Sequence, residues 1–600
     1  MVNGPEDFPR VDLDSADWDS IVWAGPAREV ERLRQRIFKA AKEEDWPKVR
    51  NLQKLMLRSR SNTLVSVRQV TQRNAGRMTA GIDEEVALTS SARADVAVRV
   101  HQSIRSWQPL AVKRVYIPKS GSSKKKLRPL GIPVIMDRCH QNRAKNALEP
   151  EWEARFEARS YGFRPGRSCQ DAVKAIHISC KGPRAKRVWA LDADLAAAFD
   201  RINQTRLLEA IGDFPGKGMI AGWLRAGVFE KGKGFAPTAE GTPQGGVISP
   251  LLMNVALHGM EEAAGVRYIA TGVRAGDIKP GSPTLIRYAD DLVVLCHSQE
   301  QAVQVKADLA EWLAPRGLAF NEDKTQIVPL SQGFDFLGFN VRRYHRKLLA
   351  KPSKAAVVRL RARLAAEMRA LRGSNAMAVI AKLNPIIRGW AAYYRGAVSK
   401  KVFASLDHYL WKLLYKWSAW SHSDKPKRWI VDRYFGKRNK FRNDHWVFGA
   451  PGTSAYVVKF AWTDIVRHIM VKGGASPDDP DLAEYWANRR QKVKPPLDSY
   501  TMRLLTRQDA LCPLCGDHLL LAGQPPESPE QWERWWLQLA RRAISADYLV
   551  HHGRPGLQPD DDQTRLVHAS CHRGHLARQR RSTAQRTRVA PAACLSRMPR

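Results

Sequence analysis

The stretch TLIRYADDLVVLC, residues 284–296, decides the fold. Apolar residues flank an acidic pair on both sides, which is typical of a β-hairpin with strands at 284–288 and 292–296. Neighbouring residues of a regular strand point to opposite faces, so a turn is needed to bring the carboxylates of Asp290 and Asp291 to one site. By itself the stretch predicts a hairpin that presents two acids.

A second acidic strand end lies well upstream of this hairpin. The segment LDADL, residues 191–195, is followed by Phe199 and Asp200. Two separate strands that carry carboxylates are what a two-metal phosphoryl-transfer site requires, because paired ions ~3.5–4 Å apart clamp the attacking and leaving oxygens. Mg²⁺ prefers carboxylates and substrate phosphates to a full protein cage. The two segments together therefore predict a magnesium site.

The composition indicates a polyanionic partner. The 600 residues include 98 Lys and Arg against 59 Asp and Glu, so the formal net charge is +39. A charge this large repels itself in a compact state unless a polyanion offsets it, which favours nucleic acid over a merely soluble basic protein. The length fits roughly three to five compact domains. The 44% hydrophobic fraction excludes a mostly disordered chain.

Membrane insertion and disulfides are not expected. No apolar run approaches the ~20 residues of a membrane span, and the acidic residues 1–20 do not form a secretory signal. Eight Cys in 600 residues do not make a disulfide framework. We expect four scattered cysteines to be reduced thiols in a cytosolic protein, namely Cys139, Cys169, Cys180 and Cys296.

Periodicity predicts an α+β domain with an antiparallel sheet, followed by helices. Residues 28–71 have a helical pattern, and a further strand is expected at 187–192. Residues 113–145 hold ten Lys or Arg against one acid, and VYIP and LGIP within them look like paired strands. We favour a hairpin that lies against a bound phosphate group. The alternative is a charged hairpin that only faces solvent. After Pro352 the pattern is helical, with Ser353 as the expected N-cap.

Several motifs occur in the order of reverse transcriptase blocks, and their wording resembles bacterial group II intron-encoded proteins. The most family-specific pieces are VYIPK…LRPLGIP (115–133) and LNPIIRGWAAYY (383–394), the second marking the maturase or thumb segment. The resemblance spans about residue 20 to the end. The other motifs are YGFRPGRS (161–168), LDADLAAAFDRI (191–202), GTPQGGVISPLL (241–252), YADD (288–291), RGLAFNEDKT (316–325) and FDFLGF (334–339).

The resemblance implies which acids bind the two Mg²⁺ ions. They are the catalytic residues Asp194, Asp290 and Asp291. Asp194 matches the family pattern better than Asp192 does, because it precedes an aliphatic residue and lies five residues before an aromatic one. Asp192 and Asp200 are then supporting acids, expected to form salt bridges with nearby arginines.

The resemblance also implies the site of the incoming dNTP. Lys119 and Arg128 contact the triphosphate, as an ammonium point charge and a bidentate fork. Phe199 lies under the sugar and leaves no room for a 2′-hydroxyl. Gln244 lies against the templating pair, and the glycines after it, Gly245 and Gly246, permit close backbone approach.

The predicted thumb combines cations with aromatic residues. Helices at 353–372 and 399–420 have apolar faces and basic faces, the latter including Arg363. Basic residues bind phosphates and aromatic rings can stack unpaired bases. In the family this region also binds intron RNA, and the sequence does not separate that role from binding of primer and template. The interleaved aromatic residues are Trp390, Tyr393, Tyr394, Tyr409, Trp411, Tyr415 and Trp420.

A small Cys/His module is expected at the end of the chain. The CxxC pair and a later HxxC predict a structural zinc site, with the ligands Cys512, Cys515, His568 and Cys571. The module resembles an HNH endonuclease, which implies that His551 and His572 bind a divalent ion such as Mg²⁺ and that His552 is the general base. The connecting loop is short and Gln563 stands near the place of the expected Asn, so the zinc fold is expected and strand cleavage is in doubt.

The predicted fold is α+β and multidomain: a right-hand polymerase with an antiparallel sheet in fingers and palm, an α-helical thumb, and a small zinc-bound HNH-like ββα module. We expect an RNA-directed DNA polymerase and maturase that binds intron RNA, an RNA template–DNA primer duplex, dNTPs and target DNA. It would act as a bacterial, cytoplasmic, nucleoid-associated ribonucleoprotein. The alternatives are a splicing cofactor without mobility and a host-adapted repair reverse transcriptase. The expected units are a flexible leader (1–25), an RNA-binding extension (26–100), fingers and palm (101–350), thumb helices (351–423), a DNA-binding region (424–505) and the HNH-like zinc domain with a basic tail (506–600).

Overall fold

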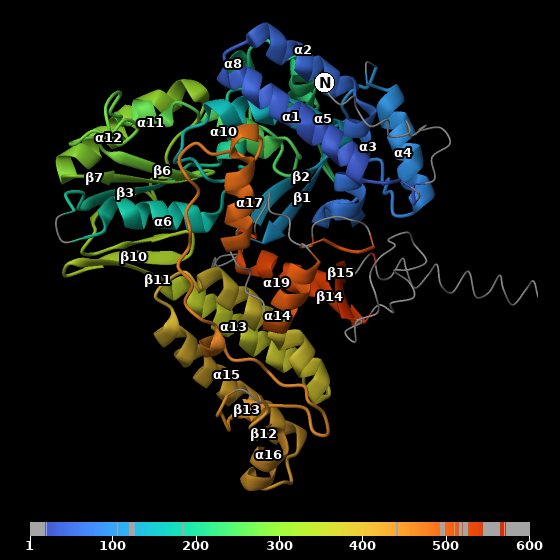
Figure 1. Cartoon of the computed structure of the whole chain (residues 1–600), viewed down its shortest axis with the longest axis vertical. Helices are drawn as coiled ribbons and strands as arrows, with labels where there is room; N and C mark the ends of the chain where they lie inside the picture. The colour runs from blue at the N-terminus through green and yellow to red at the C-terminus, as the bar shows by residue number, and fades with distance from the viewer. Residues whose placement is uncertain are drawn as a thin grey trace, which may run out of the picture.

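The computed structural model has a broad body from which a narrower, mostly helical part projects (Figure 1). Among the residues it describes, no helix has the length and apolar character to span a bilayer. The described residues are 18–19, 21–104, 106–118, 127–182, 185–439, 442–492, 499–508, 511–514, 519, 526–543, 564–568 and 571.

The N-terminal extension consists of helices packed against the long helix α5. Side-chain caps divide the predicted helical region, because Asp45 accepts a hydrogen bond from the Lys48 amide and Ser59 accepts one from the Asn62 amide. The apolar faces of α1 and α2 share one core with α5. The elements are α1 (Ala24–Lys42), α2 (Trp46–Arg58), α3 (Arg60–Arg68), a π-helical turn (Gln69–Arg73), a 3₁₀ turn (Ala75–Met78), α4 (Ser90–Gln102) and α5 (Ile135–Arg155).

The basic hairpin predicted from the sequence is present as two antiparallel strands, with Arg114 opposite Gly131. They form a four-stranded sheet in the order β2-β1-β4-β5. The strands are β1 (Val112–Pro118), β2 (Leu127–Ile132), β4 (Val228–Glu230) and β5 (Gly234–Ala236), and the nearby helices are α7 (Ala198–Arg201), α8 (Gln204–Ile211) and α9 (Lys217–Arg225).

The central sheet has the strand order β6-β7-β3-β8 and is buried on both faces. Alternate residues of each strand enter different cores, so Ile286 packs on the α6 side while Leu285 packs on the side of α10 and α12. All strand pairs in it are antiparallel, as expected. The elements are α6 (Cys169–Cys180), β3 (Trp189–Asp194), α10 (Ser249–Ala256), α11 (Met260–Ala263), β6 (Thr284–Tyr288), β7 (Asp291–Cys296), α12 (Gln299–Leu313), a 3₁₀ turn (Ala314–Arg316) and β8 (Gln326–Pro329).

A three-stranded sheet connects this body to the helical projection, which we call the thumb. Ser353 caps the first thumb helix by accepting a hydrogen bond from the Ala356 amide at 3.2 Å, which confirms the predicted start. The elements are β9 (Phe334–Phe336), β10 (Phe339–Tyr344), β11 (Lys347–Pro352), α13 (Lys354–Ala370), α14 (Ala376–Tyr394), α15 (Lys400–Ser421), α16 (Lys427–Tyr434), β12 (Phe435–Gly436) and β13 (Val447–Phe448).

After the thumb the chain returns to the body. Residues 464–482, which we call the strap, run from the thumb past α6 to the N-terminal extension (orange in Figure 1). The predicted unit 424–505 is therefore divided between the thumb tip and the body. The later elements are a 3₁₀ turn (Phe460–Trp462), a 3₁₀ turn (Pro480–Leu482), α17 (Ala483–Lys492), α18 (Ser499–Arg507), α19 (Pro529–Gln538) and an antiparallel pair, β14 (Leu539–Ala543) with β15 (Thr564–His568).

Buried polar contacts hold the strap in place. Asp171, in the first turn of α6, accepts hydrogen bonds from the Val471 amide and from His468 Nε2, each at 2.8 Å. Arg34 of α1 donates to Asp478 at 2.7 and 2.8 Å and to Glu149 at 2.9 Å. The contacts to the strap join residues 297 to 444 positions apart in the sequence. They pair charges that are costly to bury alone.

We expect Asp171→Ala to release the strap and to lower the free energy of unfolding by about 3 kcal/mol, because the buried donors lose their acceptor. Burial raises the pKa of Asp171, but His468, Ser168 and Arg489 together hold this pKa below its usual range. The stabilisation is therefore present above the ordinary pKa of an aspartate and is lost as pH falls through the lowered value. The rate of limited proteolysis within residues 464–482, followed as the pH is lowered, measures this loss of stabilisation. The control Thr89→Ala removes the side-chain cap of α4, which is far from the strap in sequence and is worth ~1 kcal/mol. Equal proteolysis rates in both variants would contradict the role of Asp171.

Candidate active site

Three carboxylates meet at one end of the central sheet, as the sequence predicts. Asp194 ends β3 and lies directly opposite Asp291, the first residue of β7. Asp290 lies in the turn between β6 and β7, next to Ala289 with its positive φ of 57°. The left-handed turn residue is what brings the acid pair to one side of the hairpin.

The carboxylates repel one another and need a cation. Burial, followed by the charges of Asp290 and Asp194, raises the pKa of Asp291 to about 7. Burial, with a contribution from Asp194, also raises the pKa of Asp290. Like charges directly opposite in a sheet are destabilising. Lys324 partly offsets them, because its Nζ lies 2.5 Å from Asp194 Oδ2 while its side chain stays 62% exposed.

The donor set fits Mg²⁺. In the described part of the chain, no group of three or more Asp, Glu, His or Cys side chains is placed so that it could hold a metal ion by itself. Mg²⁺ keeps waters and substrate phosphates and needs only one or two carboxylates. The half-buried Asp290 and Asp291, whose pKa values are raised, provide negative charge for such an ion. The exposed Lys324 is the cation that lies beside them.

Asp192 has a different partner from the predicted arginine. In the described contacts its Oδ2 accepts a hydrogen bond from Gln326 Nε2 at 3.1 Å. Burial raises the pKa of Asp192 to about 6. A neutral amide partner leaves this acid without a compensating charge, because Gln326 occupies the neighbouring position on β8.

A polar loop that sequence reasoning missed supports the hairpin from behind. Gly162 lies so close to it that an added Cβ would be 2.3 Å from the Ala289 amide nitrogen. Asn254 donates to the Gly162 carbonyl at 2.9 Å, and the buried Arg287 donates to Asn254 Oδ1 at 2.9 Å. The signal was in the sequence, because Gly162 belongs to YGFRPGRS and Arg287 to the hairpin itself. The residues that Gly162 and Arg287 contact could not be predicted from the sequence.

The residues expected around the incoming nucleotide lie near this end of the sheet. Arg128 is on β2, and its charge opposes the raised pKa of Asp290. Phe199 is half-buried and edge-on to Phe163, with ring centroids 6.3 Å apart. Its carbonyl accepts a hydrogen bond from the Thr242 amide at 2.6 Å, which ties Phe199 to the next loop.

That loop, residues 241–248, packs against the basic hairpin. The Gln244 carbonyl accepts a hydrogen bond from the Gly131 amide at 2.6 Å. Gly245 has a φ of 119°, and a Cβ there would lie 2.5 Å from the Gly131 oxygen, so glycine permits this loop to approach the backbone of the hairpin. Lys119 lies outside the described residues.

Comparison with known proteins identifies the family. Residues 117–341 match the model of reverse transcriptase (RNA-dependent DNA polymerase), and residues 18–100 match the N-terminal domain of reverse transcriptase. Residues 357–435 match the group II intron maturase-specific domain. Protein YkfC of Escherichia coli is 32% identical over 328 residues, which cover 50% of this chain and 84% of YkfC. The chain belongs to the group II intron reverse transcriptase family.

A group II intron-encoded protein, LtrA of Lactococcus lactis, is 29% identical over 326 residues, 45% of this chain and 53% of LtrA. Maturase-like protein 1 of Euglena gracilis is 23% identical over 63% of this chain and 77% of its own length. The chain is thus a reverse transcriptase with a maturase domain. Reverse transcriptases depend on divalent metal ions, in agreement with the carboxylate geometry.

The predicted base-stacking role of the thumb aromatics is wrong for three of them. Trp390, Tyr393 and Tyr394 of this reverse transcriptase are 4%, 5% and 2% exposed and belong to the core between thumb and body. The hydroxyl of Tyr393 donates to the Leu337 carbonyl at 2.8 Å. Their position among cations in the sequence suggested an exposed surface, but the body of the protein covers this face of α14. Tyr409, Trp411 and Tyr415 are half-buried, and Trp420 is 52% exposed.

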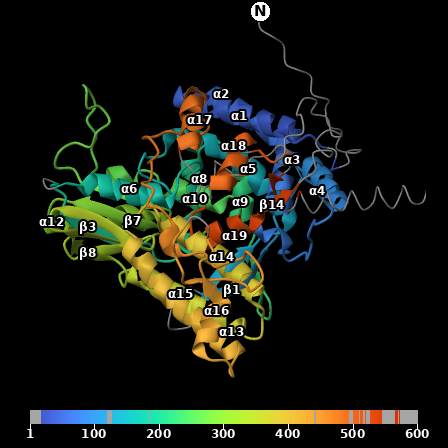
Figure 2. The same ribbon diagram turned by 60° about the horizontal axis from the view of Figure 1, so that its bottom comes forward.

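Helix α19 lies along α14, between the thumb and the body (Figures 1 and 2). Arg363 of α13 donates to both carboxylate oxygens of Glu533, at 2.8 and 3.0 Å. Gly389 permits the approach, because a Cβ there would lie 2.7 Å from the Glu533 amide nitrogen. Just before α19, the Glu527 carbonyl accepts a hydrogen bond from Cys169 of α6 at 3.4 Å. Arg363, expected to face phosphates, is therefore paired with an acid in this structure.

The described part of the Cys/His module contains two of the predicted zinc ligands. Cys512 is buried and Cys571 packs against the same small core of Leu504, Leu505 and Leu566. The other predicted positions lie outside the described residues or have side chains that are not described; they are Cys515, His551, His552, His568 and His572. Both cysteines belong to this core, and the zinc site stays a prediction.

We expect Gly162→Ala to lower the kcat of primer extension by about a hundredfold, because the added methyl displaces the backbone of the catalytic hairpin and a shift of ~1 Å has that cost. RNA affinity should not change. Single-turnover extension measures the effect. Gly218→Ala in α9 is the matched control, since a Cβ there meets nothing within 4 Å. Wild-type kcat in Gly162→Ala would mean that the hairpin is not held by this contact.

We expect Glu533→Ala to tighten binding of an RNA–DNA duplex severalfold, because the substitution frees Arg363 for phosphate contacts. Equilibrium binding with a labelled duplex measures it. Glu530→Ala on the same helix removes the same charge without breaking the bidentate pair and is the control. Equal affinities of the two variants would show that the Arg363–Glu533 contact does not compete with nucleic acid.

Proposed function

We propose that this reverse transcriptase helps its own intron to splice and then copies the intron RNA into DNA at a target site. The observation that carries the proposal is the pair of opposed carboxylates, Asp194 and Asp291, with Asp290 in the adjoining turn. The match of 357–435 to the maturase domain supports the splicing role.

In the proposed reaction the primer 3′-hydroxyl attacks the α-phosphorus of a dNTP. A phosphodiester bond forms, the bond to pyrophosphate breaks and the hydroxyl proton leaves to solvent. Two Mg²⁺ ions, when bound, lower the cost of the charge on the attacking and leaving oxygens. Asp194, Asp290 and Asp291 would hold these ions, and Lys324, whose exposed side chain pairs with Asp194, would move aside for them.

The proposed nucleotide contacts follow the surrounding loops. Arg128 and Lys119 bind the triphosphate on the side of the basic hairpin. Phe199 excludes a 2′-hydroxyl, and its placement is supported by the Phe163 ring and the Thr242 hydrogen bond. Gln244 lies against the templating pair, with its loop held on Gly131.

The proposed macromolecular partners are intron RNA, the template–primer duplex and target DNA. The excess of Lys and Arg supports them, since each phosphate contact releases counterions. We assign the N-terminal extension (26–100) and thumb to RNA, and the region 424–505 to DNA. The protein then acts as a cytoplasmic ribonucleoprotein with its intron.

For the end of the chain we propose a structural zinc held by Cys512, Cys515, His568 and Cys571. Elemental analysis of the purified chain tests it, and the absence of zinc there would refute the assignment. The HNH-like residues His551, His552 and His572 keep the pattern of a divalent-metal nuclease, but the missing Asn argues against cleavage. DNA binding by the basic tail is the proposed remaining role.

We expect Asp290→Asn to lower RNA-templated dNTP extension at least about a hundredfold, because losing a metal ligand removes several kcal/mol of transition-state stabilisation. RNA affinity should remain within a factor of two, since it comes from a far larger basic surface. The control Asp277→Asn alters an exposed carboxylate that pairs only with Arg274 in the described contacts. A normal extension rate in Asp290→Asn would refute the assignment of the active site.

A further inference from the structure

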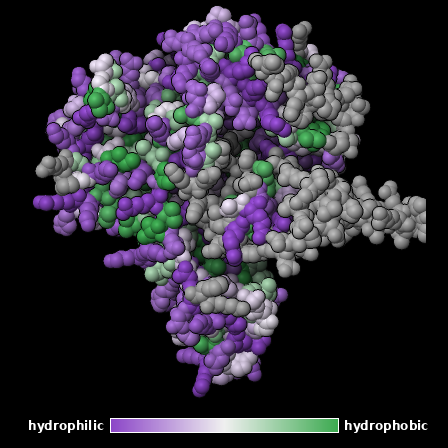
Figure 3. Space-filling model, in the orientation of Figure 1, coloured by the Kyte–Doolittle hydropathy of each residue, from purple (hydrophilic) through white to green (hydrophobic). Residues whose placement is uncertain are grey.

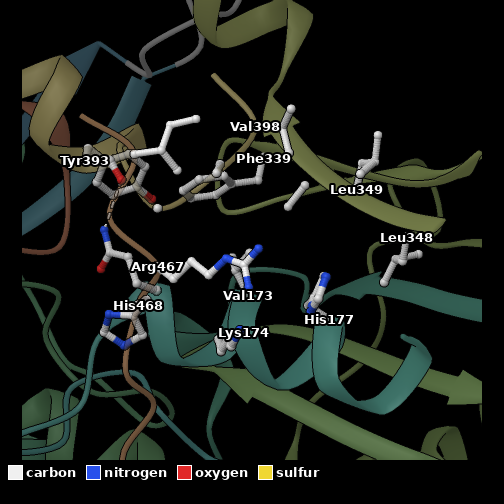
Figure 4. Close-up of a pocket in the computed structure, with 15 residues that line it drawn as sticks. Val173, Lys174, His177, Phe339, Leu348, Leu349, Tyr393, Val398, Arg467 and His468 are labelled. Carbon is white, nitrogen blue, oxygen red and sulfur yellow. Dashed lines mark hydrogen bonds between the residues drawn. The ribbon is translucent and has the colours of Figure 1, made fainter. Parts of the chain in front are cut away.

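A pocket of about 390 Å³ lies away from the active site, between α6 and the β10–β11 hairpin (Figure 4). Residues 396–398, which follow α14, and residues 465–468 of the strap complete its walls. The pocket shares no lining residue with the carboxylate site. Its volume is within the ~300–1,000 Å³ of typical ligand sites.

One wall of this pocket is apolar and partly exposed. Phe339, Leu349 and Val398 form it, and Figure 4 shows them opposite α6. Val398 is 49% exposed and Ile465 of the strap 47%. Apolar side chains gather over this part of the surface in Figure 3, with hydrophilic ones around them. An open apolar slot of this kind accepts a flat ring more readily than a charged group.

The opposite wall is cationic. Lys174 and His177 project from α6, and Arg467 reaches from the strap into the space between the walls (Figure 4). In the described part of the chain, no carboxylate lines the pocket, and Lys174 and Arg467 form no ion pair. The Nδ1 atom of His177 is buried and has no hydrogen-bond partner among the described contacts. Burial, Lys174, Lys181 and Arg467 all lower the pKa of His177, so this imidazole is neutral near pH 7 and the positive charge at the pocket comes from the lysines and Arg467.

The cations continue beyond the pocket. Lys174 lies on α6, and Lys181 directly follows the last residue of this helix, Cys180. Lys181 also lines a second, open hollow of about 510 Å³, together with Lys186 and Arg187. No carboxylate lines that hollow in the described residues either. The cations extend from the apolar slot to the second hollow. This arrangement fits a polymer with regularly spaced negative charges better than it fits a single small anion.

We propose that this pocket binds an unpaired nucleotide of single-stranded RNA. The base lies in the apolar slot, and the neighbouring phosphates contact Lys174, His177 and Arg467 and then continue to Lys181. Single-stranded RNA is recognised by unstacked bases that enter protein pockets, whereas a duplex keeps its bases inside. The inference rests on the proposed intron-RNA partner, and it adds a contact on the body of the protein, outside the cleft between palm and thumb.

The test compares two variants that act by different physics. Arg467→Ala removes a phosphate contact, so we expect about tenfold weaker binding of a labelled oligouridylate and a salt slope smaller by about 0.7. Val398→Trp fills the slot from an exposed position, so binding should weaken to a similar extent with an unchanged salt slope. Arg206→Ala, which removes an exposed ion-paired cation elsewhere, should bind like the wild type.

A second measurement separates this inference from the polymerase assignment. Both pocket variants should extend a preformed RNA–DNA hairpin at the wild-type rate, whereas Asp290→Asn should not. Crosslinking of a 4-thiouridine oligonucleotide should map to α6 and the β10–β11 hairpin in the full-length protein. Wild-type affinity in both variants, or competition by polyglutamate but not by oligouridylate, would overturn the proposal.

Discussion

The palm depends on an electrostatic conflict. Asp194 and Asp291 occupy facing positions of adjacent strands, where like charges weaken the sheet. The rest of the palm keeps them there. Both faces of the sheet are buried in apolar cores, and Gly162 and Arg287 fix the hairpin from behind. The free energy gained by burying the apolar cores thus keeps the carboxylates together in spite of their repulsion. Metal-dependent phosphoryl transfer uses such a site, because cations neutralise its negative charge.

Segments far along the chain complete this body. The strap pairs Asp478 with Arg34 and is held on α6 by Asp171, so the end of α6 next to the catalytic hairpin is tied to residues near 470. Helix α19 in turn joins the thumb to α6. These joints are charged or polar rather than purely apolar, and Arg34 is largely buried in its joint with Glu149 and Asp478. Some of the protein's cations, such as Arg34 and Arg363, are therefore already paired with acids of the same chain.

Prediction from sequence succeeded where a signal was local. The hairpin strands, the Ser353 cap and the pairing of VYIP with LGIP all depend on neighbours within a few residues. It failed where the partner comes from a distant segment. Tyr393 was placed among exposed aromatics although the body buries it, and Asp192 was given an arginine although β8 presents Gln326. Periodicity shows that a face is apolar or charged but not what covers it.

The sequence by itself determined the chemistry: three acids on two strand ends, motifs in the order of a reverse transcriptase, and a charge that requires a polyanion. Only the tertiary structure decided which charges remain available to that partner. Arg363 is paired with Glu533 from α19, whereas Lys174 and Arg467 face a pocket lined by no carboxylate in the described residues. The physical reason is that the free energy of a charged side chain depends on everything within a few ångströms, and those neighbours come from segments hundreds of residues apart.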